Sequence, residues 1–120
     1  MRLGVLDVGS NTVHLLLVDA HPGARPVPFA SHKRPLQLVA HLDAGGAVTP
    51  QGQRLLADFV AEARDFALRH RAQDMLAFTT SAIRESANGQ SVLDFVELET
   101  GVTLKELSGR QEASMTYLAV

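Results

Sequence analysis

The sequence LGVLDVGSNTVHLLLVD, residues 3–19, carries the clearest structural pattern in the chain. Leu3–Gly9 is a short apolar run that ends in a turn signal, as a buried strand does. A second apolar run, Val13–Asp19, follows after only three residues. Two apolar runs separated by Gly-Ser-Asn-Thr predict antiparallel strands joined by a tight hairpin.

The rest of the chain alternates strands and helices. Val27–Ala30 and Arg34–Val39 are typical of a third and a fourth strand, and Pro35 favours the edge or the beginning of the latter. Thr49-Pro50 predicts a helix start with threonine as cap, followed by apolar residues at helical spacing as far as Arg69-His-Arg71. Further on we expect a strand over 75–80 and a polar connection over 81–89. A helix should follow over 91–100, with Val92, Phe95, Val96 and Leu98 as its apolar set. A strand over 102–107 and a helix from Gln111 onward complete the expected elements. This order predicts an α/β domain, in which an antiparallel meander joins parallel crossover units.

Composition narrows the function classes. The formal net charge is −2, so no positive field covers the whole molecule, and we expect neither nucleic acid nor a membrane as a partner. Cysteine is absent, which excludes disulfides and thiolate metal sites and fits a reducing cytoplasm. We find no leader pattern and no membrane-length apolar run, and expect a soluble cytoplasmic protein. Because the apolar helical pattern is still running at Tyr117-Leu-Ala-Val120, we interpret the chain as truncated.

The first segment whose residues could bind a ligand is Asp7-Val-Gly-Ser-Asn-Thr12. Gly9 allows a ligand to approach the backbone, turn N–H groups can converge on phosphate oxygens, and Ser10, Asn11 and Thr12 add side-chain donors. Asp7 would repel bare phosphate, so its plausible role is to hold a hydrated divalent cation. The alternative is a hairpin turn whose residues were selected for their backbone angles alone.

The second segment is Thr79-Thr-Ser-Ala-Ile-Arg-Glu-Ser-Ala-Asn88, which follows an expected buried strand. Ligands of α/β sheets gather at that end of a strand. Arg84 is its one arginine, and a guanidinium can grip phosphate oxygens in a bidentate manner. A surface salt bridge to Glu85 or Asp94 would explain the arginine equally well.

The third segment is Leu107-Ser-Gly-Arg-Gln-Glu-Ala113. Ser108-Gly109 turns the chain from a strand into a helix, which leaves Glu112 in the first helical turn near the strand end. A carboxylate there could take a proton from water that attacks phosphorus. Glutamate is also favoured in a first turn by the helix dipole alone.

Together, the order and spacing of the three segments resemble the exopolyphosphatase/guanosine pentaphosphate phosphatase family over essentially the whole chain. The resemblance rests on Asp-x-Gly-Ser-Asn-Thr, Thr-Ser-Ala-x-Arg-x-x-x-Asn and Ser-Gly-x-x-Glu-Ala. It implies the ribonuclease H-like, actin-like ATPase fold, with residues 1–120 as its amino-terminal domain and the carboxy-terminal lobe missing.

The resemblance also implies roles for individual residues. Gly9, Ser10, Asn11, Thr12, Arg84 and Asn88 would bind phosphate, Arg84 and Glu112 would be catalytic with Glu112 as the general base, and Asp7 would hold Mg²⁺. The family removes terminal phosphate from inorganic polyphosphate or from guanosine pentaphosphate, the alarmone of the stringent response. A second phosphate loop of the family, Asp-x-Gly-Gly-Gly-Ser, does not occur here, and Asp43-Ala-Gly-Gly46 lacks its pattern. The 120 residues alone are therefore expected to be inactive.

Two other functions fit the same residues: a polyphosphate or alarmone sensor without turnover, and an actin-like ATPase or small-molecule kinase. The five histidines are scattered without ligand spacing, which argues against zinc, and His14 is expected to be a hydrogen-bonded core residue. His32-Lys-Arg34 could extend a track for a polyanion, or simply be a solvated strand start. Apolar surface left exposed by the missing lobe could join two copies as a homodimer.

Overall fold

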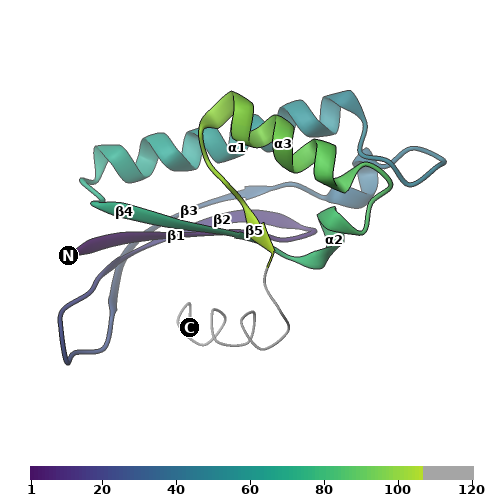
Figure 1. Ribbon diagram of the computed structural model, residues 1–120. Helices are drawn as coiled ribbons and strands as arrows, with labels where there is room; N and C mark the ends of the chain where they lie inside the picture. The colour runs from purple at the N-terminus through teal and green to yellow at the C-terminus, as the bar shows by residue number, and fades with distance from the viewer. Residues whose placement is uncertain (107–120) are drawn as a thin grey trace.

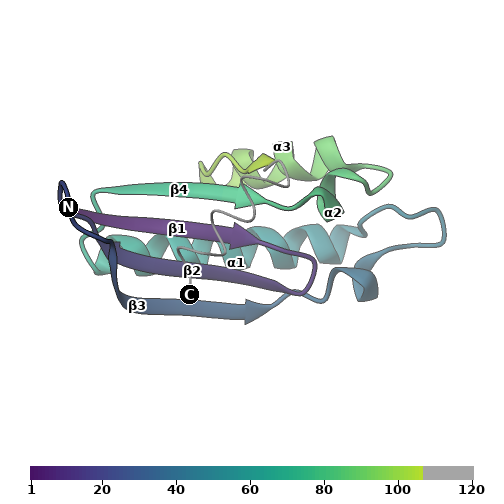
Figure 2. The same ribbon diagram turned by 90° about the horizontal axis from the view of Figure 1, so that it is seen from below.

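The computed structural model describes residues 1–106, which form one five-stranded sheet covered by helices (Figures 1 and 2). The strands are β1 (Arg2–Val8), β2 (Thr12–Asp19), β3 (Val27–Pro35), β4 (Asp74–Thr79) and β5 (Lys105–Glu106), in the order β3-β2-β1-β4-β5. β1, β2 and β3 pair antiparallel, whereas β4 and β5 join them in parallel. The predicted meander with parallel crossover units is therefore confirmed.

Both long helices lie on the same face of this sheet (Figure 1). They are α1 (Pro50–Arg69) and α3 (Gly89–Thr100); the shorter elements are the 3₁₀ helix η1 (Leu38–His41) and α2 (Ser81–Arg84). The predicted cap is present, because Thr49 Oγ1 accepts a hydrogen bond from Gly52 N at 3.1 Å. Within residues 1–106 no helix has the length and apolar character needed to cross a membrane.

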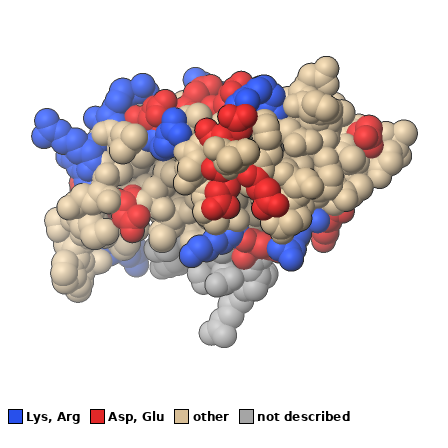
Figure 3. All heavy atoms as spheres, turned by 45° about the horizontal axis from the view of Figure 1, so that its top comes forward, with Lys and Arg blue, Asp and Glu red and all other residues tan. Residues whose placement is uncertain are grey.

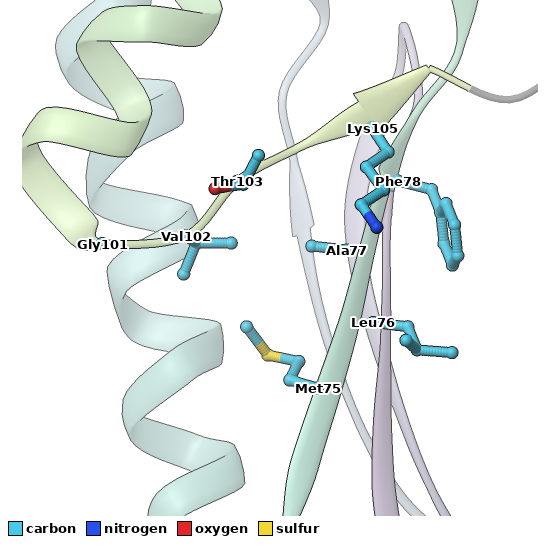
Figure 4. Close-up of a pocket in the computed structure, with 8 residues that line it drawn as sticks. All are labelled: Met75, Leu76, Ala77, Phe78, Gly101, Val102, Thr103 and Lys105. Atoms are coloured by element: carbon cyan, nitrogen blue, oxygen red, sulfur yellow. The ribbon is translucent and has the colours of Figure 1, made fainter.

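The core lies between the sheet and these two helices. Alternate residues of each strand face the helices, as the two-residue period of a strand requires, and Leu6, Leu15, Val60 and Val96 are fully buried there. Figure 4 shows the alternation along β4: Met75 and Ala77 point towards the Val102 side, whereas Leu76 and Phe78 point away from it. The opposite face of the sheet carries no helix from residues 1–106.

Several predicted elements were wrong in detail. One continuous strand, β3, replaces the two predicted strands, and it ends at Pro35 instead of beginning there. Leu38–His41 form a 3₁₀ helix in place of a strand. Leu38 N donates to Ser10 O of the β1–β2 hairpin, and Ala40 N donates to Gln37 O. The polar connection contains the short helix α2, and α3 begins at Gly89. The strand predicted over 102–107 is reduced to Lys105–Glu106 within the described residues. Leu98 is 85% exposed, and Leu93 takes its predicted place in the core. The helix predicted from Gln111 lies outside the described residues.

Candidate active site

The predicted site segments follow the carboxyl ends of adjacent parallel strands. Val8 at the end of β1 stands in register with Thr79 at the end of β4, and Thr79 stands in register with Glu106 of β5. Thr79 Oγ1 and Thr80 N both donate to Val8 O, at 3.3 and 3.0 Å. The loop after β1 and the segment after β4 therefore leave the sheet side by side, where ligands of α/β sheets bind.

The loop Gly9–Thr12 is the tight hairpin that the sequence predicted. Gly9 N donates to Thr12 O at 2.9 Å and closes the turn. The residues after β3 hold the loop from outside, because Leu36 N and Gln37 N donate to Asn11 O and Leu38 N donates to Ser10 O. Among residues 1–106 no partner hydrogen-bonds the side chains of Ser10, Asn11 and Thr12. The backbone of the loop is thus fixed by hydrogen bonds within the described residues.

Gly9 has no packing reason to be glycine in the described structure. A Cβ added at this position would meet only Thr12 O, at 3.7 Å, which is ordinary van der Waals contact. Its φ is not among the positive values, which belong to Gly23, Gly46 and Gly101 among the glycines. Space is therefore left beside the Gly9 backbone, as the predicted close approach of a phosphate requires.

Asp7 lies on β1 with its side chain on the sheet face opposite the helices. His14 of β2 is its register partner, and the two side chains share that face. The residue as a whole is exposed, yet the groups around the carboxylate remove enough water to raise the pKa of Asp7, an effect that the His14 charge opposes. His14 is half-buried beside Asp7 and is not part of the core between sheet and helices, so the expectation of a core histidine was wrong.

The Asp7 carboxylate fits a magnesium ion only as part of a ligand set. Residues 1–106 contain no cluster of three or more His, Asp or Glu side chains that could hold a metal. Protein-bound Mg²⁺ commonly has one or two carboxylates as ligands and takes the rest from water and substrate phosphates. One carboxylate at the end of β1 meets that description.

Arg84 ends α2, and its side chain is 55% exposed. Its guanidinium Nε lies 2.9 Å from Glu106 Oε2, at the end of β5. The salt bridge weighed from the sequence exists, but its partner is neither Glu85 nor Asp94. Arg84 also lines an open hollow of about 310 Å³ together with residues 86–91. Through Glu106, the guanidinium lies at the end of β5, which is in register with the end of β4.

Asn88 is the predicted phosphate ligand whose amide already has protein partners. Its Oδ1 accepts from Val48 N at 2.8 Å, and its Nδ2 donates to Val48 O at 3.1 Å. The remaining N–H of the amide has no partner within residues 1–106. A phosphate contact by Asn88 stays a prediction. Glu112, the predicted base, lies outside the described residues.

Two residues that bond to the predicted site residues were not predicted from the sequence. Glu106 was not singled out, although its place at the end of a strand before Ser108-Gly109 was a signal of the same kind as that used for Glu112. Val48 could not have been found, because its backbone meets an amide that lies 40 residues away. Long-range backbone contacts of this kind leave no trace in residue spacing.

On the helical face, the described residues place basic side chains next to acidic ones. Figure 3 shows acidic and basic side chains interspersed over it, and the exposed ion pairs there include Arg54 with Asp58 and Arg64 with Asp65. In the basic run of β3, Arg34 Nε lies 2.9 Å and His32 Nε2 lies 3.6 Å from the same oxygen of Glu62. These contacts favour a solvated, ion-paired strand over a phosphate track.

A second cleft, of about 270 Å³, lies between β4 and residues 101–105 (Figure 4). Its apolar walls include Met75 and Val102, and Lys105 reaches its rim. None of the predicted site residues within 1–106 lines it. The cleft is therefore separate from the candidate active site.

The sequence profile of the Ppx/GppA phosphatase family matches residues 17–120. The chain belongs to this family. The predicted family resemblance is confirmed.

Similar proteins include mycobacterial members of the family. Over all 120 residues the chain is 47% identical to Exopolyphosphatase 1 of Mycobacterium bovis and of Mycobacterium tuberculosis, and 46% identical to that of Mycobacterium leprae. In each case it spans 35% of the relative's length. The chain thus corresponds to about a third of these relatives.

Solved Ppx/GppA structures share the fold. The Aquifex aeolicus family member superposes with a TM-score of 0.87 at 23% identity, covering 100% of this chain and 39% of that one. An exopolyphosphatase from Cytophaga hutchinsonii superposes with a TM-score of 0.82 at 28% identity, covering 96% of this chain and 36% of that one. The predicted fold class, an α/β domain of the ribonuclease H-like, actin-like type, is confirmed by these superpositions.

Proposed function

We propose that residues 1–120 supply one side of the active site of an exopolyphosphatase, which hydrolyses the terminal phosphoanhydride of inorganic polyphosphate. The proposal rests on one observation. In a chain of the Ppx/GppA family, the Gly9–Thr12 loop follows β1 and the segment with Arg84 follows β4, and these two strands end side by side. The identity to mycobacterial proteins named Exopolyphosphatase 1 supports polyphosphate as the substrate. Guanosine pentaphosphate is the alternative substrate within the family.

In this proposal the loop and Arg84 bind the terminal phosphate. The loop offers backbone and hydroxyl donors, and Gly9 leaves room for phosphate oxygens beside the chain. Arg84 now pairs with Glu106 at the surface, and an exposed pair of this kind contributes only about 0–1 kcal/mol. The guanidinium can therefore exchange Glu106 for a multiply charged phosphate without a large loss of folding free energy.

The remaining roles complete an in-line hydrolysis. Glu112 accepts a proton from the attacking water, and Arg84 balances the charge that develops on the transferring phosphoryl group. Asp7 would hold Mg²⁺, whose chemistry when bound is to neutralise phosphate oxygens. We place the activity in the cytoplasm. We further propose that residues 1–120 are the amino-terminal domain and that a further lobe supplies the other side of the site. Residues 1–120 by themselves would pair as a homodimer through the apolar surface that this lobe covers.

The test compares phosphate release by the full product of the reading frame that contains this chain with release by residues 1–120. Short-chain polyphosphate and guanosine pentaphosphate are each supplied, with magnesium and with a chelator. We expect magnesium-dependent release from polyphosphate by the longer protein and none by the 120 residues. Binding of polyphosphate without release by the longer protein would overturn the proposal and favour a sensor. ATP hydrolysis in place of polyphosphate hydrolysis would favour an actin-like ATPase.

Replacing the arginine tests the residue assignment. Arg84→Ala should lower kcat/KM for polyphosphate by roughly 100- to 1,000-fold, because one preorganised donor to the developing charge is lost. Arg54→Ala is the matched control: Arg54 is also half exposed and ion-paired, with Asp58 and Glu99, but it lies on α1. An Arg84→Ala enzyme as active as the Arg54→Ala enzyme would remove Arg84 from the mechanism.

A further inference from the structure

The turn between α2 and α3 is tied to a distant hairpin, residues 42–48. The Asn88 carboxamide makes two hydrogen bonds to the backbone of Val48, at 2.8 and 3.1 Å. Ala87 N donates to Gly46 O at 3.0 Å. Three bonds thus join the segment that carries Arg84 to a part of the chain about 40 residues earlier.

The hairpin that receives these bonds is itself fixed. Leu42 and Val48 form a β-bridge, and Asp43 Oδ1 accepts from the N–H groups of Gly45 and Ala47 at 2.9 and 3.0 Å. Val48 is 2% exposed, and its carbonyl also accepts from Gln53 Nε2 on α1. A buried, bonded partner of this kind gives Asn88 an anchor connected to the core.

Gly89 fixes the same turn from the other side. A Cβ at Gly89 would lie 2.5 Å from Ile83 O and 2.7 Å from both Cα and O of Arg84. Real Cβ atoms essentially never come so close to backbone, so any side chain here would displace residues 83–84. Ile83 is fully buried and cannot move freely, so the displacement would fall on Arg84.

We propose that Asn88 and Gly89 are positioning residues that set the location of the Arg84 guanidinium, and that Asn88 acts through Val48 and not by binding phosphate. This inference rests on the proposed function. Asn88 fixes the turn by its carboxamide, and Gly89 allows α3 to begin directly against the Arg84 backbone. A guanidinium misplaced by about 1 Å loses much of its catalytic effect, which makes such support functionally important.

The test is a double-mutant cycle in the full-length protein, with polyphosphate as substrate. Asn88→Ala and Gly89→Ala should each lower kcat/KM by roughly 10- to 100-fold. In an Arg84→Ala background neither should cause a further loss, because the residue through which they act is already absent. Multiplicative losses for Asn88→Ala would show an independent phosphate contact and overturn the inference.

A readout independent of activity accompanies the cycle. Amide hydrogen exchange at Val48 N–H and Ala87 N–H should accelerate at least 10-fold in Asn88→Ala. Gln73→Ala is the control, because it removes a carboxamide contact to backbone, that with Arg2 N, at the other end of the sheet. It should leave both exchange and kcat/KM unchanged. Unchanged exchange in Asn88→Ala would also overturn the inference.

Failure of the proposed function has a different signature. An unsubstituted protein that releases no phosphate from polyphosphate would overturn the function, and the inference with it. Normal release combined with multiplicative losses or unchanged exchange would overturn the inference alone. If Asn88→Ala does not fold, Gly89→Ala and the milder Asn88→Ser replace it in the same double-mutant cycle.

Discussion

At the scale of single residues, neither Asp7 nor Gly9 is explained by packing or by stability within the described residues. Shielding from water raises the pKa of the Asp7 carboxyl, so ionisation of this carboxyl destabilises the folded state. Gly9 has an open side where a methyl group would fit. Both residues give up some stability that other choices would recover. Such concessions concentrate at functional sites.

Asp7→Asn should make the protein more stable at neutral pH. Because the folded-state pKa is raised above 3.8, the Asp7 contribution is fully favourable only below the unfolded-state pKa and is lost as pH rises through the folded-state pKa. The asparagine variant has no such loss. Thermal melts should therefore show a higher Tm for Asp7→Asn at pH 7 and a smaller advantage at pH 3.5. A lower Tm for the variant at pH 7 would contradict this account.

Gly9→Ala should separate stability from activity. Among residues 1–106 the added Cβ has no closer neighbour than Thr12 O, so the free energy of unfolding should change by less than about 0.5 kcal/mol. If phosphate oxygens approach the Gly9 backbone, kcat/KM for polyphosphate should fall roughly 10-fold or more. Denaturant unfolding and phosphate release measure the two effects. Full activity in Gly9→Ala would show that the loop does not approach phosphate at this residue.

At the scale of elements, the start of α1 should depend on its cap. Thr49 Oγ1 accepts from Gly52 N, and Thr49→Ala would leave that donor without its partner. The free energy of unfolding should fall by about 1 kcal/mol. Thr49→Ser keeps the oxygen and should retain most of the stability. Urea unfolding of the three proteins provides the measurement, and equal midpoints for alanine and threonine would contradict the prediction.

Elements set by local signals could be predicted, and those set by distant contacts could not. The β1–β2 hairpin and the Thr49 cap are written within a few residues of sequence, and both were predicted correctly. The extent of β3 was not, because the sequence has no local signal for the bonds that bend residues 36–38 onto Ser10 and Asn11. Leu98 was misplaced although helical spacing puts it about 160° around the helix from Val96, on the exposed face; it was assigned to the core by its apolar character and not by its position.

The same distinction applies to the candidate site. Arg84 and the Gly9–Thr12 loop carry recognisable motifs, and their meeting at adjacent strand ends follows from the parallel pairing of β1 and β4. The partners of Arg84 and Asn88, which are Glu106 and Val48, come from packing between segments far apart in the chain. Glu112 and Mg²⁺ stay predictions. The phosphate contact predicted for Asn88 is untested, and the two hydrogen bonds of its amide to Val48 favour the positioning role proposed above.

At the scale of the whole molecule, the core between sheet and helices determines stability. Leu15 on β2 is fully buried, whereas Leu98 on α3 is 85% exposed. Leu15→Ala should lower the free energy of unfolding by about 2–5 kcal/mol, because it leaves a cavity. The same substitution at Leu98 should change it by less than about 0.5 kcal/mol. Equal effects at the two positions in urea unfolding would contradict the two-layer core.

The central place of β1 has a consequence for synthesis on the ribosome. The β1–β2–β3 meander uses only early residues, but the other edge of β1 receives β4 through contacts that span 71 residues. At about 5–20 residues per second, that edge waits for several seconds with its backbone groups unpaired. The strand that leads into the Gly9–Thr12 loop is thus exposed to mispairing longer than its neighbours, until α1 and β4 have emerged.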